Sequence, residues 1–171
     1  IGSCLSRLLV RDGQQVLLIG RDPLKIRELA DELGQASSVF DPSLSASVEE
    51  AIAAHIPQLG AVTAIVNAIG SVLLKPAHST SDGEFRDVIE TNLFTSFAAV
   101  RAAGKLMREQ GGSVLLFASA AASIGIPNHE AIAAAKAGIV GLAKSAAATY
   151  AGSNIRFNVV SPGLVKTNLT Q

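Results

Sequence analysis

The sequence predicts an α/β fold, a doubly wound parallel sheet with helices on both faces in a three-layer arrangement. Short apolar runs typical of buried strands alternate along the chain with longer segments of helical spacing, and short turns join them. About half of the residues (49%) are apolar, and the mean hydropathy of +0.38 suits a sheet that is buried on both faces. Right-handed crossovers between parallel strands then place helices on both sides of the sheet.

The first half of the chain is expected to hold three helices and three strands. The second helix has the clearest limits, because Asp22 can cap its N-terminus, Pro23 suits the first helical position, and Gly34 follows its end. Ser47 and Glu50 have the spacing of a capping box for the third helix. The expected elements are a helix over 3–11 with apolar Cys4, Leu5, Leu8 and Leu9, a strand over 16–19, a helix over 23–33, a strand over 38–40, a helix from 47 to about His55, and a strand over 64–66 that ends at Asn67.

The second half contains the unit around which we expect the site to form. An apolar strand over 113–118 ends at Ser119, and the helix over 128–150 that follows carries Lys136. Open parallel sheets bind ligands at the carboxyl edge of their strands, so the serine hydroxyl and the lysine ammonium are expected there. The other elements predicted in this half are a long helix that begins at a capping box of Ser81 and Glu84 and ends near Gly111, and a strand over 156–160 closed by Ser161-Pro162-Gly163; Asn128 is expected to cap the helix over 128–150.

Composition excludes several functional classes. Fourteen basic residues balance fourteen acidic ones without a run of like charge, which argues against a nucleic-acid or membrane-surface partner. No uninterrupted run of about 18 apolar residues predicts a membrane span. Cys4 is the only cysteine, expected to be a small buried hydrophobe, and the reducing cytoplasm is the expected compartment. No metal site is predicted.

The length fits one domain, and the chain is expected to be a fragment, because it opens inside a helical pattern and stops soon after a strand.

Several collinear segments resemble motifs of the short-chain dehydrogenase/reductase family, over essentially the whole chain. Each motif alone is weak, and their order and spacing make the resemblance specific. The matching segments are Ile1-Gly2 with the end of the glycine-rich TGxxxGIG loop, Asn67-Ala68-Ile69-Gly70 with NNAG, Asn92 with the catalytic asparagine, Ser119 with the catalytic serine, Lys136-Ala137-Gly138 with the lysine of YxxxK, and Ser161-Pro162-Gly163 plus Thr167 with the PG motif and its cofactor-binding threonine.

The resemblance implies a single dinucleotide-binding domain of Rossmann type over residues 1–171, with its first strand and its C-terminal portion missing. In the family, the first strand lies in the middle of the sheet, between the second and the fourth. Without it, backbone groups of both neighbouring strands lack partners, which is costly where they are buried. Residues 1–171 alone are therefore not expected to form a stable domain that binds its cofactor.

The resemblance implies a nicotinamide dinucleotide as cofactor, and the end of the second family strand indicates which one. An acidic residue there favours NAD, whereas here Gly20 is followed by Arg21, whose guanidinium can pair with a 2′-phosphate. We therefore expect NADP (NADPH), with NAD as the alternative and a solvated surface role as the plainer interpretation of Arg21. By resemblance, the other cofactor-binding residues are Gly2 at the pyrophosphate, Asp41 by the adenine, Asn67, Ala68 and Gly70 along the adenosine ribose, Lys136 at the nicotinamide ribose, and Pro162, Gly163 and Thr167.

The expected catalysis lacks one component. In the family, hydride moves between the nicotinamide and a carbonyl or alcohol carbon while a tyrosine exchanges the proton, helped by the lysine one helical turn away. By resemblance, Asn92, Ser119 and Lys136 fill their roles here, but the tyrosine position is Ile132, which can neither donate nor accept a proton. Tyr150 lies more than four turns further along the helix and cannot replace it.

Two interpretations follow. In the first, His129, three residues before Ile132 on the same helix face, takes over proton transfer as a neutral imidazole. In the second, the protein binds a dinucleotide but is catalytically silent, a sensor or an oligomerisation partner. The plainer alternatives are an ordinary first-turn histidine, a strand-end serine and a helix-kink asparagine. The expected partners are a small carbonyl or alcohol substrate and, because the two long helices pack between subunits in relatives, further copies in a homodimer or homotetramer.

Overall fold

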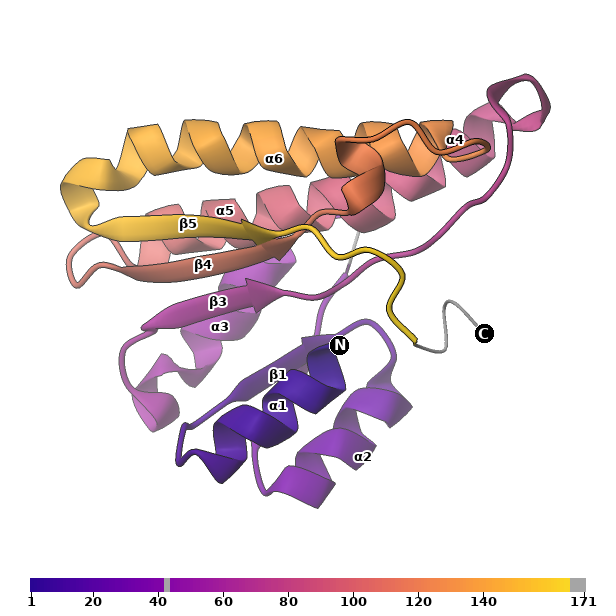
Figure 1. Ribbon diagram of the computed structural model, residues 1–171. Helices are drawn as coiled ribbons and strands as arrows, with labels where there is room; N and C mark the ends of the chain where they lie inside the picture. Colours follow the sequence, from indigo (N-terminus) through magenta and orange to yellow (C-terminus); the bar gives the residue numbers. More distant parts are fainter. Residues whose placement is uncertain (42–43, 167–171) are drawn as a thin grey trace.

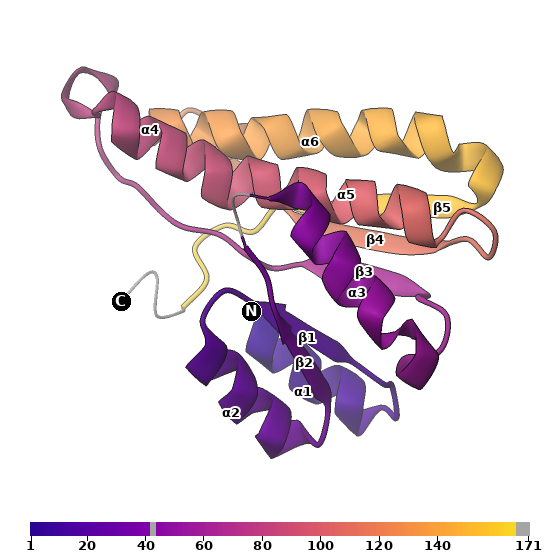
Figure 2. The same cartoon turned by 180° about the vertical axis from the view of Figure 1, so that it is seen from behind.

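A computed structural model describes residues 1–41 and 44–166 as an α/β fold. Parallel strands form the middle layer; α1 and α2 lie on one side of it, and α3, α5 and α6 on the other (Figures 1 and 2). The predicted α/β class with helices on both faces is therefore confirmed. The helices are α1 (Gly2–Arg11), α2 (Pro23–Leu33), α3 (Ser45–Leu59), α4 (Asp82–Ile89), α5 (Thr95–Leu106) and α6 (Glu130–Tyr150), with short turns η1 (Ala77–Ser79), η2 (Glu90–Phe94, π-helical), η3 (Ala120–Ala122) and η4 (Ala151–Ser153).

The strands form two separate parallel sheets rather than one. Strand β1 (Leu17–Gly20) pairs with β2 (Ala36–Val39), and β3 (Ala64–Asn67) pairs with β4 (Gly112–Phe117), which pairs with β5 (Ile155–Val160). Between β1 and β3 lies a cavity of about 430 Å³ that both strands line with apolar side chains. The sheet is therefore interrupted at the place where the sequence led us to expect a central strand.

Helix limits follow the predicted caps in two places. The Asp22 carboxylate accepts hydrogen bonds from the amides of Leu24 and Lys25, and Gly34 ends α2 in the left-handed conformation (φ 62°). At α4, the Ser81 hydroxyl accepts from the Glu84 amide and the Glu84 carboxylate accepts from the Ser81 amide, as a capping box requires. These start signals were read correctly because each side chain has the geometry to reach the free amides of the first turn.

Three sequence-based expectations at helix ends were wrong. Helix α3 begins at Ser45, so Ser47 is already inside it, and its hydroxyl donates to the carbonyl of Leu44 instead of capping. Asn128 takes a left-handed conformation (φ 63°) and does not cap α6, whose first residue is Glu130 and whose N-cap is His129. The long helix ends at Leu106, five residues before Gly111. The local pattern permits several starting residues, and the surrounding chain selects one of them.

The principal core lies between β3–β5 and the helices α5 and α6. Its fully buried side chains include Met107, Val114, Leu116 and Ile139. In contrast, α1 buries none of its residues and Cys4 is exposed, so the expectation of a buried cysteine was wrong. Helix α1 contacts α2 and lines the cavity at the interruption of the sheet with Leu5 and Leu9.

One helix passes a length and composition test for crossing a membrane. The stretch Glu130–Ser153 around α6 has a mean hydropathy of 1.3, although no uninterrupted apolar run predicted it. Core helices of α/β proteins pass the same test, and α6 buries Ala135, Lys136 and Ile139 among its inward-facing residues. We therefore assign α6 to the helical layer that covers the sheet.

Candidate active site

The carboxyl ends of β3, β4 and β5 meet at one edge, and hydrogen bonds join the loops that follow them. The amide of Ala118 donates to the carbonyl of Val160 (2.8 Å), and the amide of Ala120 donates to the carbonyl of Pro162 (2.9 Å). Ser119 lies between these two contacts, half-buried, and its hydroxyl accepts a hydrogen bond from the Ala121 amide (3.2 Å). The structure thus positions Ser119 and the Pro162-Gly163 turn beside each other, as the sequence predicts for neighbouring strands.

Asn92 is completely buried within the π-helical turn η2. Its side-chain oxygen accepts from the Ser71 amide (3.2 Å), and its side-chain nitrogen donates to the Ser71 hydroxyl (3.0 Å) and the Val88 carbonyl (2.9 Å). A π turn widens the helix locally and is frequent at functional sites. Sequence reasoning identified Asn92 but missed Ser71, because a serine in a loop gives no periodic signal.

Asn67 and Gly70 connect β3 to this turn. The buried Asn67 side chain donates to the hydroxyls of Thr95 (3.2 Å) and Ser96 (3.0 Å). A Cβ atom placed on Gly70 would lie 3.0 Å from the Asn92 side-chain oxygen and 3.5 Å from the Lys136 Nζ. A side chain at residue 70 would therefore press on the Asn92 side chain, so glycine lets the loop after β3 pass close to the asparagine and the lysine.

Lys136 is 8% exposed, and its ammonium group donates to the carbonyl of Phe117 at 2.8 Å. Burial lowers the pKa of Lys136 from 10.5 to about 8, because desolvation disfavours the charged form. Within residues 1–41 and 44–166, no carboxylate lies within ion-pair distance of it. The described part of the site thus holds a buried lysine whose lowered pKa has desolvation as its cause.

Ile132 and His129 lie on the helix turns before Lys136 but have different surroundings. Ile132 is 4% exposed in an apolar cluster with Val88, Ala131 and Ala135, which Leu73 and Ile89 help to cover. His129 is at the N-cap of α6, and its Nδ1 lies 2.7 Å from the Pro127 carbonyl. A carbonyl can only accept, so this contact places the proton on Nδ1 and leaves Nε2 of the neutral ring as an acceptor.

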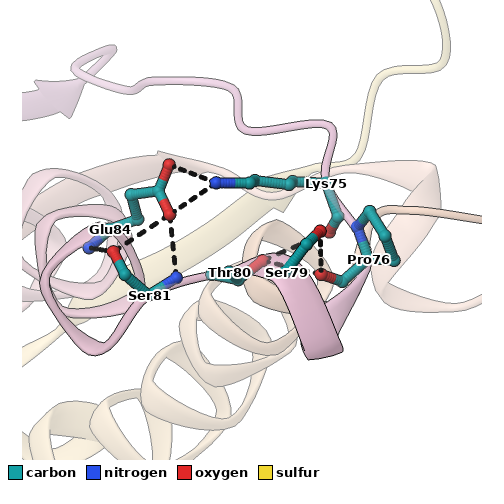
Figure 3. A network of polar contacts seen from close by, with 6 residues as sticks. All are labelled: Lys75, Pro76, Ser79, Thr80, Ser81 and Glu84. Atoms are coloured by element: carbon teal, nitrogen blue, oxygen red, sulfur yellow. Dashed lines mark hydrogen bonds and ion pairs between the residues drawn. The ribbon is translucent and has the colours of Figure 1, made fainter.

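The loop that covers Ile132 is anchored by an ion pair that the sequence did not predict. The Lys75 ammonium lies 2.8 and 2.9 Å from the two carboxylate oxygens of Glu84, which also accept from Ser81 (Figure 3). These contacts, with the Lys75 hydrogen bond first, lower the pKa of Glu84 to about 2. The Lys75 amide donates to the Asn128 carbonyl (2.8 Å), so the loops before α4 and α6 form one wall of the site.

A second hollow, of about 660 Å³, lies at the carboxyl end of β1 between α1 and α2. Arg21, Lys25 and Arg7 supply its positive charge. Glu32 binds Arg7 through two contacts of 2.7 Å, and Asp22 lies 3.5 Å from Lys25, whereas the exposed Arg21 has no contact with a carboxylate among the described residues. Arg21 is therefore the free cation at this position.

The remaining residues predicted to bind a cofactor fall on both sides of the interruption. Gly2 begins α1, and a Cβ on it would lie 3.3 Å from that of Ala68, so the start of α1 and the end of β3 meet. Asp41 is exposed after β2, and Thr167 lies outside the described residues. Among the described residues, no group of three His, Cys, Asp or Glu side chains could hold a metal ion.

Comparison with known proteins adds to this geometry. The family model described as enoyl-(acyl carrier protein) reductase matches residues 1–171. The inactive 2-(S)-hydroxypropyl-CoM dehydrogenase 2 of Xanthobacter autotrophicus is 34% identical over 164 residues, covering 94% of this chain and 71% of that protein. The D-threitol dehydrogenase of Mycolicibacterium smegmatis is 30% identical over 175 residues, covering 99% of this chain and 67% of that protein.

Solved structures agree in fold. The X-ray structure of an alcohol dehydrogenase from Thermococcus sibiricus, complexed with 5-hydroxy-NADP, is similar with a TM-score of 0.86. Its sequence is 27% identical, and the match covers 99% of this chain and 75% of that one. The likeness therefore extends over nearly the whole chain.

Proposed function

Because this chain belongs to the short-chain dehydrogenase/reductase family, whose members are NAD(P)-dependent oxidoreductases, we propose that it transfers hydride between NADP and a carbonyl or secondary alcohol through an altered active site. The observation that carries this proposal is the convergence of Asn92 and Lys136 on Gly70 at the carboxyl edge of the sheet. The substrate would lie beside Ser119, and the expected compartment is the cytoplasm.

The preference for NADP over NAD rests on Arg21. Its guanidinium lines the hollow at the end of β1 without a carboxylate partner among the described residues, and a 2′-phosphate is the group it would pair with bidentately. Asp22 does not oppose this, because its carboxylate caps α2. The Thermococcus sibiricus structure with its NADP analogue supports the same preference.

The residues present fit a dinucleotide. The hollow beside Arg21 has room for the adenosine end, the uncapped start of α1 at Gly2 has no acidic residue in its first turn, and Gly70 lets the loop after β3 pass close to Lys136. A bound nicotinamide would supply the hydride. Lys136 would hold its ribose, Pro162 and Gly163 would contact it from the β5 loop, and the Ser119 hydroxyl would orient the substrate oxygen.

Proton exchange is the altered step, and we assign it to His129. Its Nδ1 contact with Pro127 leaves Nε2 as an acceptor, which suits removal of a proton from an alcohol. In the direction of carbonyl reduction, His129 must first take up a second proton. The Ile132 side chain would only contribute apolar surface at the position of the tyrosine, together with Leu73, which packs against the same cluster.

A specific observation also favours the second candidate function, a silent dinucleotide-binding protein. Ile132 is buried in an apolar cluster, whose side chains cannot exchange a proton in place of a tyrosine. The similar protein of Xanthobacter autotrophicus is itself named an inactive dehydrogenase. In this case Lys136 would contact the ribose without any turnover.

The deciding experiment uses the full-length protein, not residues 1–171 alone, and compares the parent with His129→Ala and Ile132→Tyr. Thermal shift with NADPH and NADH measures binding, and oxidation of NADPH with a panel of carbonyl compounds measures turnover. We expect NADPH to stabilise all three proteins, and turnover by the parent to fall at least about tenfold in His129→Ala. His78→Ala, at another exposed histidine, is the matched control.

Each other outcome selects an alternative. Binding without turnover in the parent, together with turnover in Ile132→Tyr, would establish the silent binder. Turnover that survives His129→Ala would remove the histidine from the mechanism. If neither dinucleotide stabilises the parent, both candidate functions fail. Arg21→Gln should weaken NADPH binding more than NADH binding, whereas Arg27→Gln, outside the hollow, should change neither.

We also propose a homodimer or homotetramer. Small residues occupy much of the surface of α6 that faces away from the core, which allows a helix of another copy to approach closely. Light scattering would measure the assembly, and introducing a glutamate at Ala137 should disrupt it. The exposed or half-buried residues of this surface are Ala133, Ala134, Ala137 and Gly141, whereas Gly138, also a small residue of α6, lies against Leu93 within the chain.

A further inference from the structure

Three hydrogen bonds around one buried side chain tie the loop after β3 to the π-helical turn η2. The Asn92 side-chain oxygen accepts from the Ser71 amide at 3.2 Å. The side-chain nitrogen, which is completely buried with its residue, donates to the Ser71 hydroxyl at 3.0 Å and to the Val88 carbonyl at 2.9 Å. A side-chain amide has two N–H donors, so both donors of Asn92 are used within the chain.

These partners fix which end of the Asn92 amide faces Lys136. The Ser71 amide can only donate and the Val88 carbonyl can only accept, so the oxygen and nitrogen of Asn92 cannot exchange places. A Cβ atom at Gly70 would lie 3.0 Å from the Asn92 oxygen and 3.5 Å from the Lys136 Nζ. Both atoms therefore face the same point of the loop. The partial negative charge of the oxygen favours an ammonium group there, whereas the amide nitrogen would oppose it.

The Ser71 hydroxyl is the part of this contact that depends on the residue type. Any residue except proline would supply the main-chain amide at position 71, but the hydroxyl also accepts the second N–H of the buried Asn92 amide. Without the hydroxyl, that buried donor would lose its acceptor, which is costly. We expect Asn92 then to rotate toward another acceptor and to withdraw its oxygen from Lys136.

We propose that Ser71 is a positioning residue of the active site, whose hydroxyl holds the Asn92 amide so that its oxygen faces Lys136. The inference rests on the proposed function, because that function gives Asn92 and Lys136 their roles. Ser71 acts through Asn92 and is not itself assigned a contact with substrate or cofactor. The main chain of Asn92 is held separately, because the Ser96 hydroxyl donates to its carbonyl at 2.9 Å.

Steady-state kinetics of the full-length protein tests the inference with Ser71→Ala and Ser71→Thr. Because a misplaced group slows the chemical step, we expect kcat for NADPH oxidation with a carbonyl compound to fall at least about tenfold in Ser71→Ala. KM and the Kd for NADPH should stay within about twofold of the parent. Threonine keeps the hydroxyl and should restore kcat to within about threefold. Ser145→Ala, at an exposed serine of α6, is the matched control.

A double variant separates action through Asn92 from other effects. In an Asn92→Ala background, Ser71→Ala should cause no further loss of kcat, because the side chain that it positions is absent. A loss of kcat that persists in this background would overturn the proposal. So would an unchanged kcat in Ser71→Ala, or a loss that Ser71→Thr does not restore.

Hydrogen exchange provides a measurement that does not need turnover. The amide of residue 71 donates to the buried Asn92 oxygen, so it should exchange at least about tenfold faster in Ser71→Ala than in the parent. Unchanged exchange would show that the main-chain contact suffices and would overturn the proposal. Faster exchange in Ser71→Ala of a parent without turnover would support the role of Ser71 at Asn92 and would count against the proposed hydride transfer alone.

Discussion

The Lys136 ammonium group donates a 2.8 Å hydrogen bond to the main-chain carbonyl of Phe117, the last residue of β4. This bond joins α6 to the carboxyl end of the strand that delivers Ser119. It directs the lysine by backbone geometry rather than by a carboxylate. No carboxylate of the described residues pairs with the lysine at this position, and desolvation by burial lowers its pKa to about 8.

We expect Lys136→Met to stabilise the protein at neutral pH. The lowering of the pKa from 10.5 to about 8 corresponds to about 3 kcal/mol of unfavourable burial of the charge. Loss of the hydrogen bond to Phe117 offsets about 1 kcal/mol of the gain. Urea unfolding followed by circular dichroism should therefore give a variant about 2 kcal/mol more stable than the parent at pH 7.

The difference in unfolding free energy between the parent and Lys136→Met depends on pH, and the pKa of Lys136 determines the sign of this dependence. Between pH 8 and 10.5 the unfolded state binds more protons at Lys136 than the folded state, so the stability of the parent relative to Lys136→Met rises with pH. Below pH 8 both states are protonated and the difference is constant. Parallel stability curves from pH 7 to 10 would show that Lys136 has an ordinary pKa.

Gly104→Ala should destabilise the packing of α5 on α6. A Cβ atom at Gly104 would lie 2.6 Å from Cζ of the Tyr150 ring, and the Phe157 ring, tilted against it with centroids 5.8 Å apart, restricts the movement of that ring. Overpacking of this kind costs about 1–3 kcal/mol, more than the helix propensity gained from alanine. Chemical unfolding measures the loss, and Gly83→Ala, whose Cβ would be no closer than 4.0 Å to another side chain, is the matched control.

A double variant identifies the cause. If the clash with the ring is responsible, Gly104→Ala combined with Tyr150→Leu should be less destabilised than the sum of the two single variants, by about 1 kcal/mol. Strict additivity would mean that Gly104 is required for its backbone conformation or for another neighbour.

Glu84→Gln should loosen the loop over Ile132. It removes the ion pair with Lys75 and weakens the capping box at Ser81 (Figure 3). Because the folded-state pKa of Glu84 is lowered to about 2, its stabilising effect is complete above about pH 4.5 and is lost as the pH falls toward 2. The melting temperature of Glu84→Gln should be below that of the parent at pH 7, and the gap should narrow below pH 4.5.

Asp87→Asn is the control for this prediction, because Asp87 is exposed on the same helix and forms no ion pair with Lys75. A gap that stays constant from pH 7 to 3 would mean that the Glu84 charge does not stabilise the loop.

Sequence reasoning succeeded where one residue type has one geometric use. Asp22 before Pro23, and Ser81 three residues before Glu84, can act only on the first turn of a helix that begins there. It failed at Ser47, because a serine inside the first turn also satisfies its hydroxyl by donating to a preceding carbonyl. Hydrophobic periodicity and capping patterns in a sequence do not distinguish a serine at the N-cap from a serine inside the first turn.

The site was only partly predictable for a different reason. Motifs predicted Asn92, Ser119 and Lys136 as candidate site residues, but the partners that hold Asn92 and Lys136 come from loops and main-chain atoms that have no motif. Ser71 holds Asn92 through its amide and hydroxyl, and Phe117 holds Lys136 through its carbonyl. Such contacts are set by how the chain folds in three dimensions, so a linear pattern does not contain them.

The interruption between β1 and β3 leads to a last prediction, for a polypeptide of residues 1–171 studied alone. Among residues 1–41 and 44–166, strand β4 is paired on both sides, whereas β1 pairs only with β2 and β3 only with β4, and a cavity of about 430 Å³ lies between β1 and β3. Unpaired strand edges beside a cavity open easily and promote association between chains. Hydrogen exchange should therefore be slowest at Val114–Leu116 and markedly faster along β1 and β3. Heating should give a broad transition with aggregation, and NADPH should bind weakly. A cooperative transition with tight NADPH binding, or equal protection of β1, β3 and β4, would show that the two sheets are stable without a strand between them.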